Sequence, residues 1–501
     1  MATDLAPGAG SDAASITALT TAARPRIALW QVVVLGSHAA MLVWVVSHHE
    51  PWFDEAQAWL LARDASVYDL IVKYPRYEGS PALWHLILAV PAKLGAPYIT
   101  LQILSGAGAF LTAVLIVVRS PFPPWMRAAL PFSYWLFYQY GVVARSYVLL
   151  GPLLFILATV WPTRRERPVR ILVLLLLLAN VSFHGFLIAG GVMAVQTIEL
   201  RRTWAELSPR QRRLHVGAQI CLGVMAAALF VQLRPPPDAS FVSARDFHFR
   251  VDDAWRAARK ITQGGFTGSG LTLLLGVIPT LVFLKRSRGV LLWLLPTAAV
   301  IAFSVIRYFN IWHQGVLVLI WIFALWCAWT PTAERSQRGP GRWSAAALAA
   351  MTIVVAVQLS WTAHSVHYDI KRPYSGAAAT ARYLKPIVAA GGRINTRSIE
   401  SVSVQPYFKS NIFANYDRGR GGSYWWWSTR ADLHPTPELL ITNHPDAIVY
   451  GDKQGGLPEP LVRPAFPGYH VGAYLRGALF LKDRFFEQDG FWVFVPDEAR
   501  R

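Results

Sequence analysis

Residues 27–59 read IALWQVVVLGSHAAMLVWVVSHHEPWFDEAQAW, and this stretch decides the fold class. Its first part, 27–47, contains no Asp, Glu, Lys or Arg and is long enough to cross a membrane, because a hydrocarbon core of about 30 Å requires roughly 20 apolar residues of helix. The polar stretch Met1–Arg26 precedes it and no small-residue cleavage site follows, so we interpret it as a retained span and not as a signal peptide. Asp54 and Glu55 follow directly after this span.

Apolar segments of this kind recur along the rest of the chain. Of its 501 residues, 54% are hydrophobic and only 15% are charged, which is more apolar than a typical soluble domain. We therefore predict a mainly α-helical, polytopic membrane protein of about 11 transmembrane helices. Besides 27–47, the predicted spans are 98–118, 122–140, 146–162, 169–183, 185–200, 215–233, 270–285, 289–306, 314–330 and 344–362. Residues 81–93 are apolar but short, and they predict a helix lying in the outer interface.

The formal net charge of +19 has two readings, a surface that binds polyanions or a signal of membrane topology. Lys and Arg concentrate in alternate connections between the predicted spans, which the positive-inside rule assigns to the cytoplasm. These connections are 119–127, 163–170, 201–214, 285–289 and 331–343. We therefore expect a cytoplasmic arm at 1–26, an extracytoplasmic C-terminus and no nucleic-acid partner.

Three regions are predicted to face the outside. Two are loops of the transmembrane domain 27–362, at 48–97 and 234–269, and the third is a domain of its own at 363–501. The sequence of this last region predicts a small α/β domain with a helix from Ser375 to Ala389 that Gly391 and Gly392 close. The predicted strands are Ala447–Tyr450, Ala478–Leu481 and Phe491–Val495.

Carboxylates are distributed in a way that favours a site in the outer loops. Between Ala254 and Ala333 there is no Asp or Glu, although three predicted spans lie there. Ion-coupled transporters usually keep carboxylates at membrane depth, so this pattern argues against coupled transport. The spans are interpreted as scaffold.

Asp54 is the leading candidate for chemistry. A carboxylate at the membrane boundary beside Trp52 and Phe53 is partly desolvated and could orient or deprotonate a hydroxyl group. The alternative is that Asp54 caps a helix beginning at Ala56, and both roles can hold together. Within the same loop, Ser66 and Asp69 form a capping-box pattern for a second short helix.

Glu78 is a second outer carboxylate. Together with Asp54 and a histidine such as His85 or His184 it could complete a site for a divalent cation. No HxH or HExxH spacing supports a metal, so a structural role is favoured, and a lone histidine such as His184 is more often a satisfied interface residue.

Arg145 and Arg307 lie in otherwise uncharged outer turns. An arginine at head-group level can hold a phosphate through two parallel hydrogen bonds, and the alternative is an arginine that reaches ordinary phospholipid. The stretch GGFTGSG at 264–270 lacks the lysine of a phosphate loop and predicts a flexible hinge. Trp425, Trp426 and Trp427, with Arg418 and Arg420 nearby, favour the membrane interface over sugar stacking.

Several short motifs resemble those of the GT-C membrane glycosyltransferases. They are FDEAQAW at 53–59, EGSPALWH at 78–85, ARSY at 144–147, His184 at an outer turn and RY at 307–308. The chain is most similar to the bacterial family-39 type, which includes protein O-mannosyltransferases and lipid A aminoarabinose transferases. A plan of about a dozen spans followed by an outer domain fits the same resemblance.

The resemblance implies an inverting glycosyltransferase of the bacterial inner membrane. Its donor would be a sugar on a polyprenyl phosphate, and its acceptor an envelope lipid, glycan or protein. The catalytic Asp of the family maps to Asp54 and the second acidic residue of the loop to Glu78, and Arg145 would contact the donor phosphate. We add Glu55 to the catalytic candidates and expect Arg307 to hold the phosphate together with Arg145. Metal use differs within the family, so the resemblance does not decide whether a divalent cation takes part.

Two functions from other classes remain open at this point. One is a flippase or other transporter of lipid-linked sugars, and the other is a non-enzymatic envelope assembly protein. A transporter would move the lipid-linked sugar without transferring it, and an assembly protein would tolerate the loss of Asp54.

Overall fold

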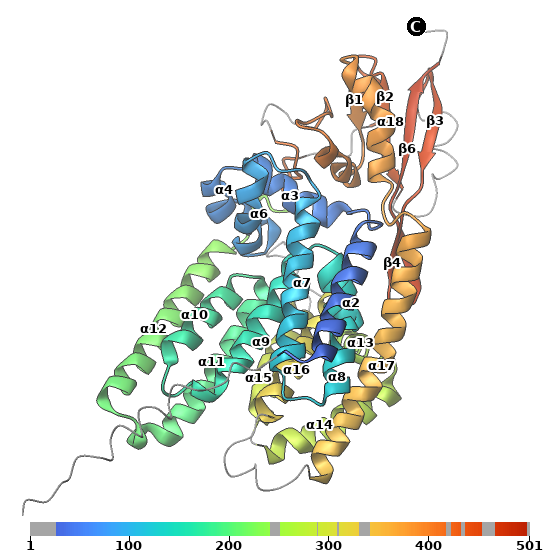
Figure 1. Cartoon of the computed structure of the whole chain (residues 1–501). Coiled ribbons are helices and arrows are strands. Elements are labelled where there is room, and N and C mark those ends of the chain that lie inside the picture. Colours follow the sequence, from blue (N-terminus) through green and yellow to red (C-terminus); the bar gives the residue numbers. More distant parts are fainter. Residues whose placement is uncertain are drawn as a thin grey trace, which may run out of the picture.

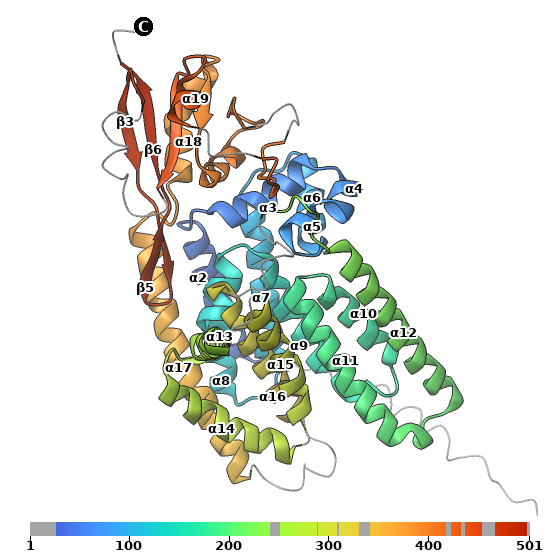
Figure 2. The ribbon, with the colours of Figure 1, turned by 180° about the vertical axis from the view of Figure 1, so that it is seen from behind.

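The computed structural model describes residues 27–240, 251–287, 289–307, 310–329, 341–416, 422–431, 436–452 and 466–497. Within these ranges the chain forms a helical bundle with a small strand-containing domain at one end, which we call the domain end (Figures 1 and 2). The helices of the bundle are α2 (Leu29–Val46), α7 (Thr100–Arg119), α9 (Leu150–Val160), α10 (Pro168–Ala179), α11 (Phe183–Thr203), α12 (Pro209–Gln232), α13 (Val251–Phe266), α14 (Gly270–Arg286), α15 (Val290–Ile306), α16 (Gln314–Trp329) and α17 (Arg342–Lys371).

Seven helical segments of the described chain are long and apolar enough to cross a membrane. They contain α2, α7, α9, α11, α12, α16 and α17, and they coincide with seven of the predicted spans. Together they indicate a polytopic membrane protein, because apolar helices of this length match the thickness of a bilayer.

The other predicted spans do not reach that length as single straight helices. Helices α10 and α15 are apolar but shorter, and α14 joins α13 across a bend of 77°. The described residues hold seven or eight candidate spans by length and composition, and the predicted count of 11 is not confirmed. The predicted span 122–140 breaks into α8 (Pro124–Ala129), a 3₁₀ turn η1 (Leu130–Phe132) and a π-helix η2 (Trp135–Val142). Inside η2, Tyr140 departs from helical geometry with φ −115° and ψ 19°.

Helix α13 corrects the expectation for the predicted outer loop 234–269. It packs against α15 and α16, so this part of the loop belongs to the bundle, while 241–250 lie outside the described residues. The glycine-rich stretch at the end of α13 packs closely against Gln314, because a Cβ at Gly265 would lie 2.7 Å from the Gln314 carbonyl oxygen. The predicted hinge coincides with the 77° bend between α13 and α14, and its flexibility stays a prediction.

Short helices follow the first span at the domain end (Figure 1). They are α3 (Phe53–Asp64), α4 (Val67–Val72), α5 (Tyr74–Glu78) and α6 (Leu83–Lys93). The predicted cap at the start of α4 is confirmed, because Ser66 Oγ accepts the Asp69 backbone N–H at 3.0 Å. Helix α6 is the short apolar helix expected at 81–93.

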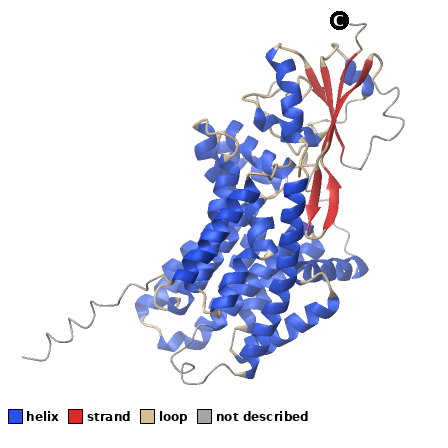
Figure 3. Cartoon of the chain, turned by 45° about the vertical axis from the view of Figure 1, so that its right-hand side comes forward, coloured by secondary structure: helices blue, strands red, loops and turns tan. Residues whose placement is uncertain are grey.

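The C-terminal domain carries most of the strands (Figure 3). Its main sheet has the order β1-β2-β6-β3, with β1 parallel to β2 and the other pairs antiparallel. The predicted helix and strands are present, and α17 continues to Lys371, beyond the predicted span end at 362. The elements are α18 (Ala377–Ala389), β1 (Ile394–Thr396), η7 (Ile399–Tyr407), α19 (Pro437–Ile441), β2 (Ala447–Asp452), β3 (Tyr469–Leu475), β4 (Ala478–Leu481), β5 (Arg484–Gln488) and β6 (Gly490–Pro496).

Polar contacts dock this domain onto the helices that follow the first span. The Arg63 Nη1 of α3 donates to the Phe408 carbonyl at 2.8 Å, and the neighbouring Asp64 Oδ2 accepts the Ser423 backbone N–H at 3.0 Å. The Glu50 carboxylate accepts the backbone N–H of Ala378 at the start of α18. The hairpin β4–β5 forms a separate two-stranded sheet that runs beside α17 (Figures 1 and 2).

Candidate functional site

A cavity of about 940 Å³ lies where the short helices of the domain end meet the bundle. Its lining comes from α3, α5 and α6, from the turn after η2, from the ends of α11, α12 and α15, and from strand β5. Six of the seven predicted site residues line it, namely Asp54, Glu78, His85, Arg145, His184 and Arg307. The seventh, Glu55, is fully buried beside the cavity and does not line it.

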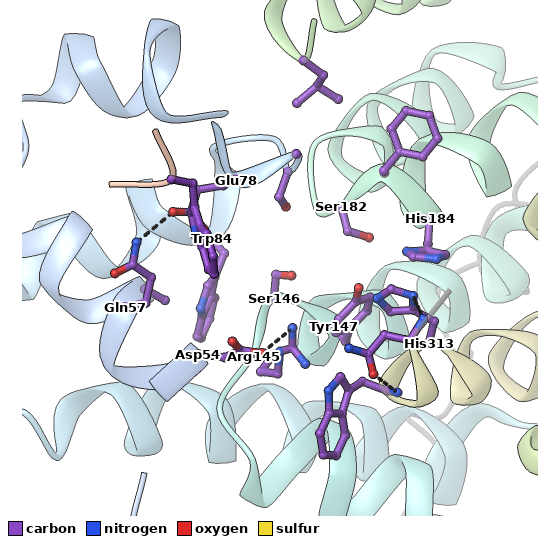
Figure 4. Close-up of a pocket in the computed structure, with 18 of the residues that line it drawn as sticks. Asp54, Gln57, Glu78, Trp84, Arg145, Ser146, Tyr147, Ser182, His184 and His313 are labelled. Carbon is purple, nitrogen blue, oxygen red and sulfur yellow. Dashed lines mark hydrogen bonds and ion pairs between the residues drawn. The ribbon is translucent and has the colours of Figure 1, made fainter. Parts of the chain in front are cut away.

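Asp54 and Arg145 form an ion pair inside this cavity (Figure 4). The distance between Asp54 Oδ2 and Arg145 Nη2 is 2.9 Å, and both side chains keep contact with solvent. Helix α3 begins at Phe53 with Trp52 as its N-cap residue, so Asp54 lies in the first turn and is not the cap. This leaves the Asp54 carboxylate available to the cavity.

Glu55 takes the structural role that had been considered for Asp54. Its carboxylate accepts the backbone N–H of Trp52 at 3.2 Å, which satisfies one of the open donors at the start of α3. The other oxygen accepts the backbone N–H of Ala144 at 2.6 Å, directly before Arg145. The predicted direct catalytic role of Glu55 is therefore replaced by a positioning role, because the side chain holds the turn that carries Arg145.

A chain of buried polar groups continues from Glu55 into the bundle. His49 Nε2 lies 3.2 Å from Glu55 Oε2, and His49 Nδ1 lies 2.8 Å from Asp369 Oδ2 of α17. Tyr138 of η2 donates to the same Asp369 oxygen at 3.0 Å. Burial acts to lower the pKa of His49, but the charges of Asp369 and Glu55 outweigh it and raise the pKa to about 10. The imidazolium thus balances two buried carboxylates.

Glu78 faces the cavity from the end of α5 (Figure 4). Burial raises its pKa to about 8, a hydrogen bond from Gln57 acts against this rise, and the charge of Asp54 adds to it. Gln57 Nε2 donates to Glu78 Oε1 at 2.8 Å. At neutral pH Glu78 therefore carries a proton and can donate a hydrogen bond, whereas a carboxylate only accepts.

Histidines occupy two separate parts of the cavity. His184 of α11 lies against His313, with ring centroids 4.3 Å apart. His85 lies in α6, and burial lowers its pKa to about 4. Among the described residues, no group of three His, Cys, Asp or Glu side chains could hold a metal ion. The cation site suggested from Asp54, Glu78 and a histidine is not formed among these residues.

Other lining residues were not singled out from the sequence. The bundle side of the cavity is apolar, with Phe183, Phe230 and Phe303 from three different helices. Indole rings and small polar groups complete the lining, with Trp84, Trp312, Gln57, Ser146, Ser182 and Asn310 among them. Ser146, Trp84 and Gln57 lie within or beside the motifs already quoted, so their neighbourhood was a usable signal. Trp312 lies five residues after Arg307 and outside the quoted motifs.

The tryptophan run at 425–427 packs against helix α3. Gln57 binds both the N–H and the C=O of Trp425, at 2.7 and 2.8 Å, and the Trp427 ring lies 6.0 Å from that of Phe53. Trp427 also lines the cavity. Their place at the membrane interface stays a prediction, while Arg418 and Arg420 lie outside the described residues.

No protein-family model, no curated protein and no solved structure matches this chain.

Proposed function

We propose that this protein is a membrane glycosyltransferase that uses a sugar carried on a polyprenyl phosphate. The observation that carries the proposal is the common cavity of Asp54, Arg145 and Arg307, at the junction between apolar helix ends and polar short helices. The GT-C resemblance of the motifs around these residues points to the same chemistry.

The lining of the cavity suits the parts of such a donor. Phe183, Phe230 and Phe303 offer apolar surface for the first isoprene units of the chain. Guanidinium groups bind phosphate through pairs of hydrogen bonds, so Arg145 and Arg307 are assigned to the phosphate. Indoles such as Trp84 and Trp427 present flat apolar faces of the kind on which sugar rings stack.

The proposed reaction is a direct displacement at the anomeric carbon. The acceptor hydroxyl loses its proton to the Asp54 carboxylate as its oxygen attacks that carbon from the face opposite the phosphate. The bond from the anomeric carbon to the phosphate oxygen breaks, and its electron pair leaves with the phosphate. The two guanidinium groups stabilise the charge that develops there, and the sugar configuration inverts.

Glu78 and Glu55 have supporting roles in this scheme. Protonated Glu78 donates a hydrogen bond to substrate and places no second negative charge beside Asp54, so it is a substrate-binding residue and not the base. Glu55 acts through the backbone of Ala144 to fix Arg145. The domain end is assigned to the extracytoplasmic face of a bacterial inner membrane, where envelope lipids, glycans and proteins are available as acceptors.

Reconstitution tests the proposal. The purified chain in lipid vesicles is given radiolabelled polyprenyl-phosphate sugars and an envelope extract, and transfer of label to acceptor is measured for the wild type and for Asp54→Asn. Asp69→Asn is the matched control, because Asp69 is a carboxylate of the neighbouring helix α4 that does not line the cavity. We expect Asp54→Asn to lose transfer by about 10²- to 10⁴-fold.

Other outcomes would favour the other classes of function. Equal transfer by Asp54→Asn and the wild type would exclude Asp54 as the base. Movement of labelled lipid across the vesicle membrane without transfer would favour a flippase. The absence of both activities would favour an assembly protein.

A further inference from the structure

The hairpin β4–β5 of the C-terminal domain is anchored deep in the bundle by the residue at its turn. Lys482 has a left-handed backbone (φ 63°) and is only 6% exposed. Its side-chain Nζ donates to Gly264 O and to Gln314 Oε1, both at 2.6 Å, and lies over the rings of Trp135 and Trp361. Two hydrogen bonds and two cation–π contacts hold the hairpin at one fixed depth beside the cavity.

A β-bulge in this hairpin points two consecutive side chains at the cavity. Leu479 pairs with Glu487 and Phe480 pairs with Phe485, so Phe486 has no partner in the opposite strand. In a regular strand, neighbouring side chains point to opposite faces. Here Phe486 and Glu487 both line the cavity, as a bulge allows, since an inserted residue re-aims the side chains around it.

Phe486 extends an aromatic row that runs along the cavity wall. Its ring lies 5.2 Å from that of Trp312, and the Trp312 ring lies 5.4 Å from that of Trp52. Trp52 is two residues before Asp54, and Trp312 follows Arg307 in the link between α15 and α16. The row therefore joins the proposed base to the proposed phosphate-binding side, which is where the sugar of a lipid-linked donor must lie.

We propose that Phe486 and Glu487 form a subsite for the sugar of the lipid-linked donor. This inference rests on the proposed function and assigns part of sugar recognition to the C-terminal domain. The Phe486 ring, 41% exposed, offers an apolar face to the C–H groups of a pyranose. The Glu487 carboxylate accepts hydrogen bonds from sugar hydroxyls, which a sugar-free polyprenyl phosphate does not offer.

Binding measurements test the subsite without depending on transfer. The full chain in nanodiscs is titrated with polyprenyl-phosphate glucose, galactose and mannose, and with the same polyprenyl phosphate without a sugar. The wild type is expected to bind one of the sugar-bearing lipids about tenfold or more tightly than the sugar-free lipid. Glu487→Gln and Phe486→Ala are expected to lose most of this preference while they bind the sugar-free lipid as the wild type does.

Two further variants make the test specific. Phe485→Ala removes a neighbouring exposed ring of the same strand that does not line the cavity, so it should keep the preference of the wild type. Lys482→Met removes the anchor, and it should lose the preference if the hairpin has to be docked for sugar binding.

The outcomes separate this inference from the proposed function. Three results would each overturn the subsite. They are a wild type without sugar preference, an unchanged preference in Glu487→Gln and Phe486→Ala, and equal weakening of binding for all four lipids. A change confined to the KM for the acceptor would also overturn it and would assign these residues to the acceptor. Sugar preference that depends on Phe486 and Glu487, in a protein that transfers no sugar, would support the subsite and overturn the transferase.

Discussion

Asp54 and Arg145 neutralise each other in the cavity, with 2.9 Å between the carboxylate oxygen and the guanidinium nitrogen. The two residues come from segments far apart in the chain, and Glu55 links these segments, because it follows Asp54 in α3 and accepts the backbone N–H of Ala144, which precedes Arg145. A donor phosphate that binds Arg145 has to take this guanidinium from Asp54. Donor binding would then release the Asp54 carboxylate for the acceptor hydroxyl, so the base becomes available when the leaving group is in place.

This competition predicts opposite effects of two neutral substitutions on donor binding. Asp54→Asn removes the competing carboxylate and should bind polyprenyl phosphate as tightly as the wild type or up to about fivefold more tightly, because a solvent-accessible ion pair is worth about 0.2–1 kcal/mol. Arg145→Gln should bind it more weakly. Titration of both variants in nanodiscs measures this, and weaker binding by Asp54→Asn would contradict the competition.

The pKa of Glu78 predicts how transfer depends on pH. Because this pKa is raised to about 8, Glu78 loses its proton as the pH rises through that value, and a second negative charge then appears near Asp54. We expect the initial rate of transfer to fall above about pH 8 in the wild type. Glu78→Gln, which cannot ionise, should show no such fall, and Asp69→Asn should keep the wild-type profile.

The proton on Glu78 also makes the stability of the protein depend on pH. The folded protein holds the Glu78 proton more tightly than the unfolded chain, where a glutamate titrates near about 4.3. This contribution to the free energy of unfolding is complete below that pH and is lost as the pH rises through about 8. Thermal unfolding in detergent should therefore be less sensitive to pH between these values in Glu78→Gln than in the wild type.

The buried chain of Glu55, His49 and Asp369 predicts a positioning effect of Glu55→Gln. Loss of one carboxylate leaves the charged His49 less balanced, which should lower the free energy of unfolding by about 3–5 kcal/mol. A looser Ala144–Arg145 turn should weaken binding of sugar-bearing and sugar-free polyprenyl phosphate by the same factor. Asp369→Asn should lose similar stability, and its lipid binding should change less because it does not contact that turn.

The raised pKa of His49 adds a pH test to this prediction. A histidine whose folded pKa lies near 10 contributes stability that is complete below about pH 6.5 and is lost as the pH rises toward about 10. Melting temperatures of the wild type should fall across this range. A His49→Gln variant that kept the whole wild-type fall would rule out His49 as its source.

Two neighbouring glycines of α11 offer a matched pair for the packing of the bundle. A Cβ at Gly191 would lie 2.7 Å from backbone atoms of Pro296 in α15, whereas a Cβ at Gly190 would meet nothing within 4 Å. We expect Gly191→Ala to lower the free energy of unfolding by about 1–3 kcal/mol through overpacking. Gly190→Ala should be neutral or stabilising, because alanine is the better helix former. Equal melting temperatures of the two variants would refute the close contact.

The sequence predicted the helices well where one physical signal dominated. Long uncharged runs such as Leu29–Val46 and Thr100–Arg119 fold as expected, because backbone groups in lipid must be satisfied within a helix. The run 122–140 is less apolar, with Arg127, Gln139 and three prolines, and its helix breaks at Pro131 between α8 and η2. Hydropathy reports burial and is blind to the close approach of Gly141 to Ala109, where a Cβ would come within 2.9 Å of another Cβ. The predicted count of about 11 spans stays a prediction beyond the seven or eight that the described residues hold.

The sequence predicted those residues of the candidate site that lie in short local motifs, but not the contacts between them. Asp54, Glu78 and Arg145 could be picked out because charges are rare beside apolar runs and because their neighbours resemble known motifs. Glu55 carries the same charge as Asp54, and only tertiary contacts show that it points to Ala144 and His49. The sequence could not predict that Phe486 and Glu487 line the cavity. The bulge that directs these side chains depends on strand register, and no single residue in RFFEQ indicates it.

The hairpin β4–β5 is one of the last parts of the chain to be synthesised. Strand β5 follows every candidate span of the described chain, so it leaves the ribosome after α17. Until Lys482 reaches Gly264 and Gln314, the cavity lacks one wall. The segments that carry Asp54 and Arg145 are therefore synthesised before the strand that we propose binds the sugar. Assembly in this order would keep an unfinished enzyme from consuming its lipid donor.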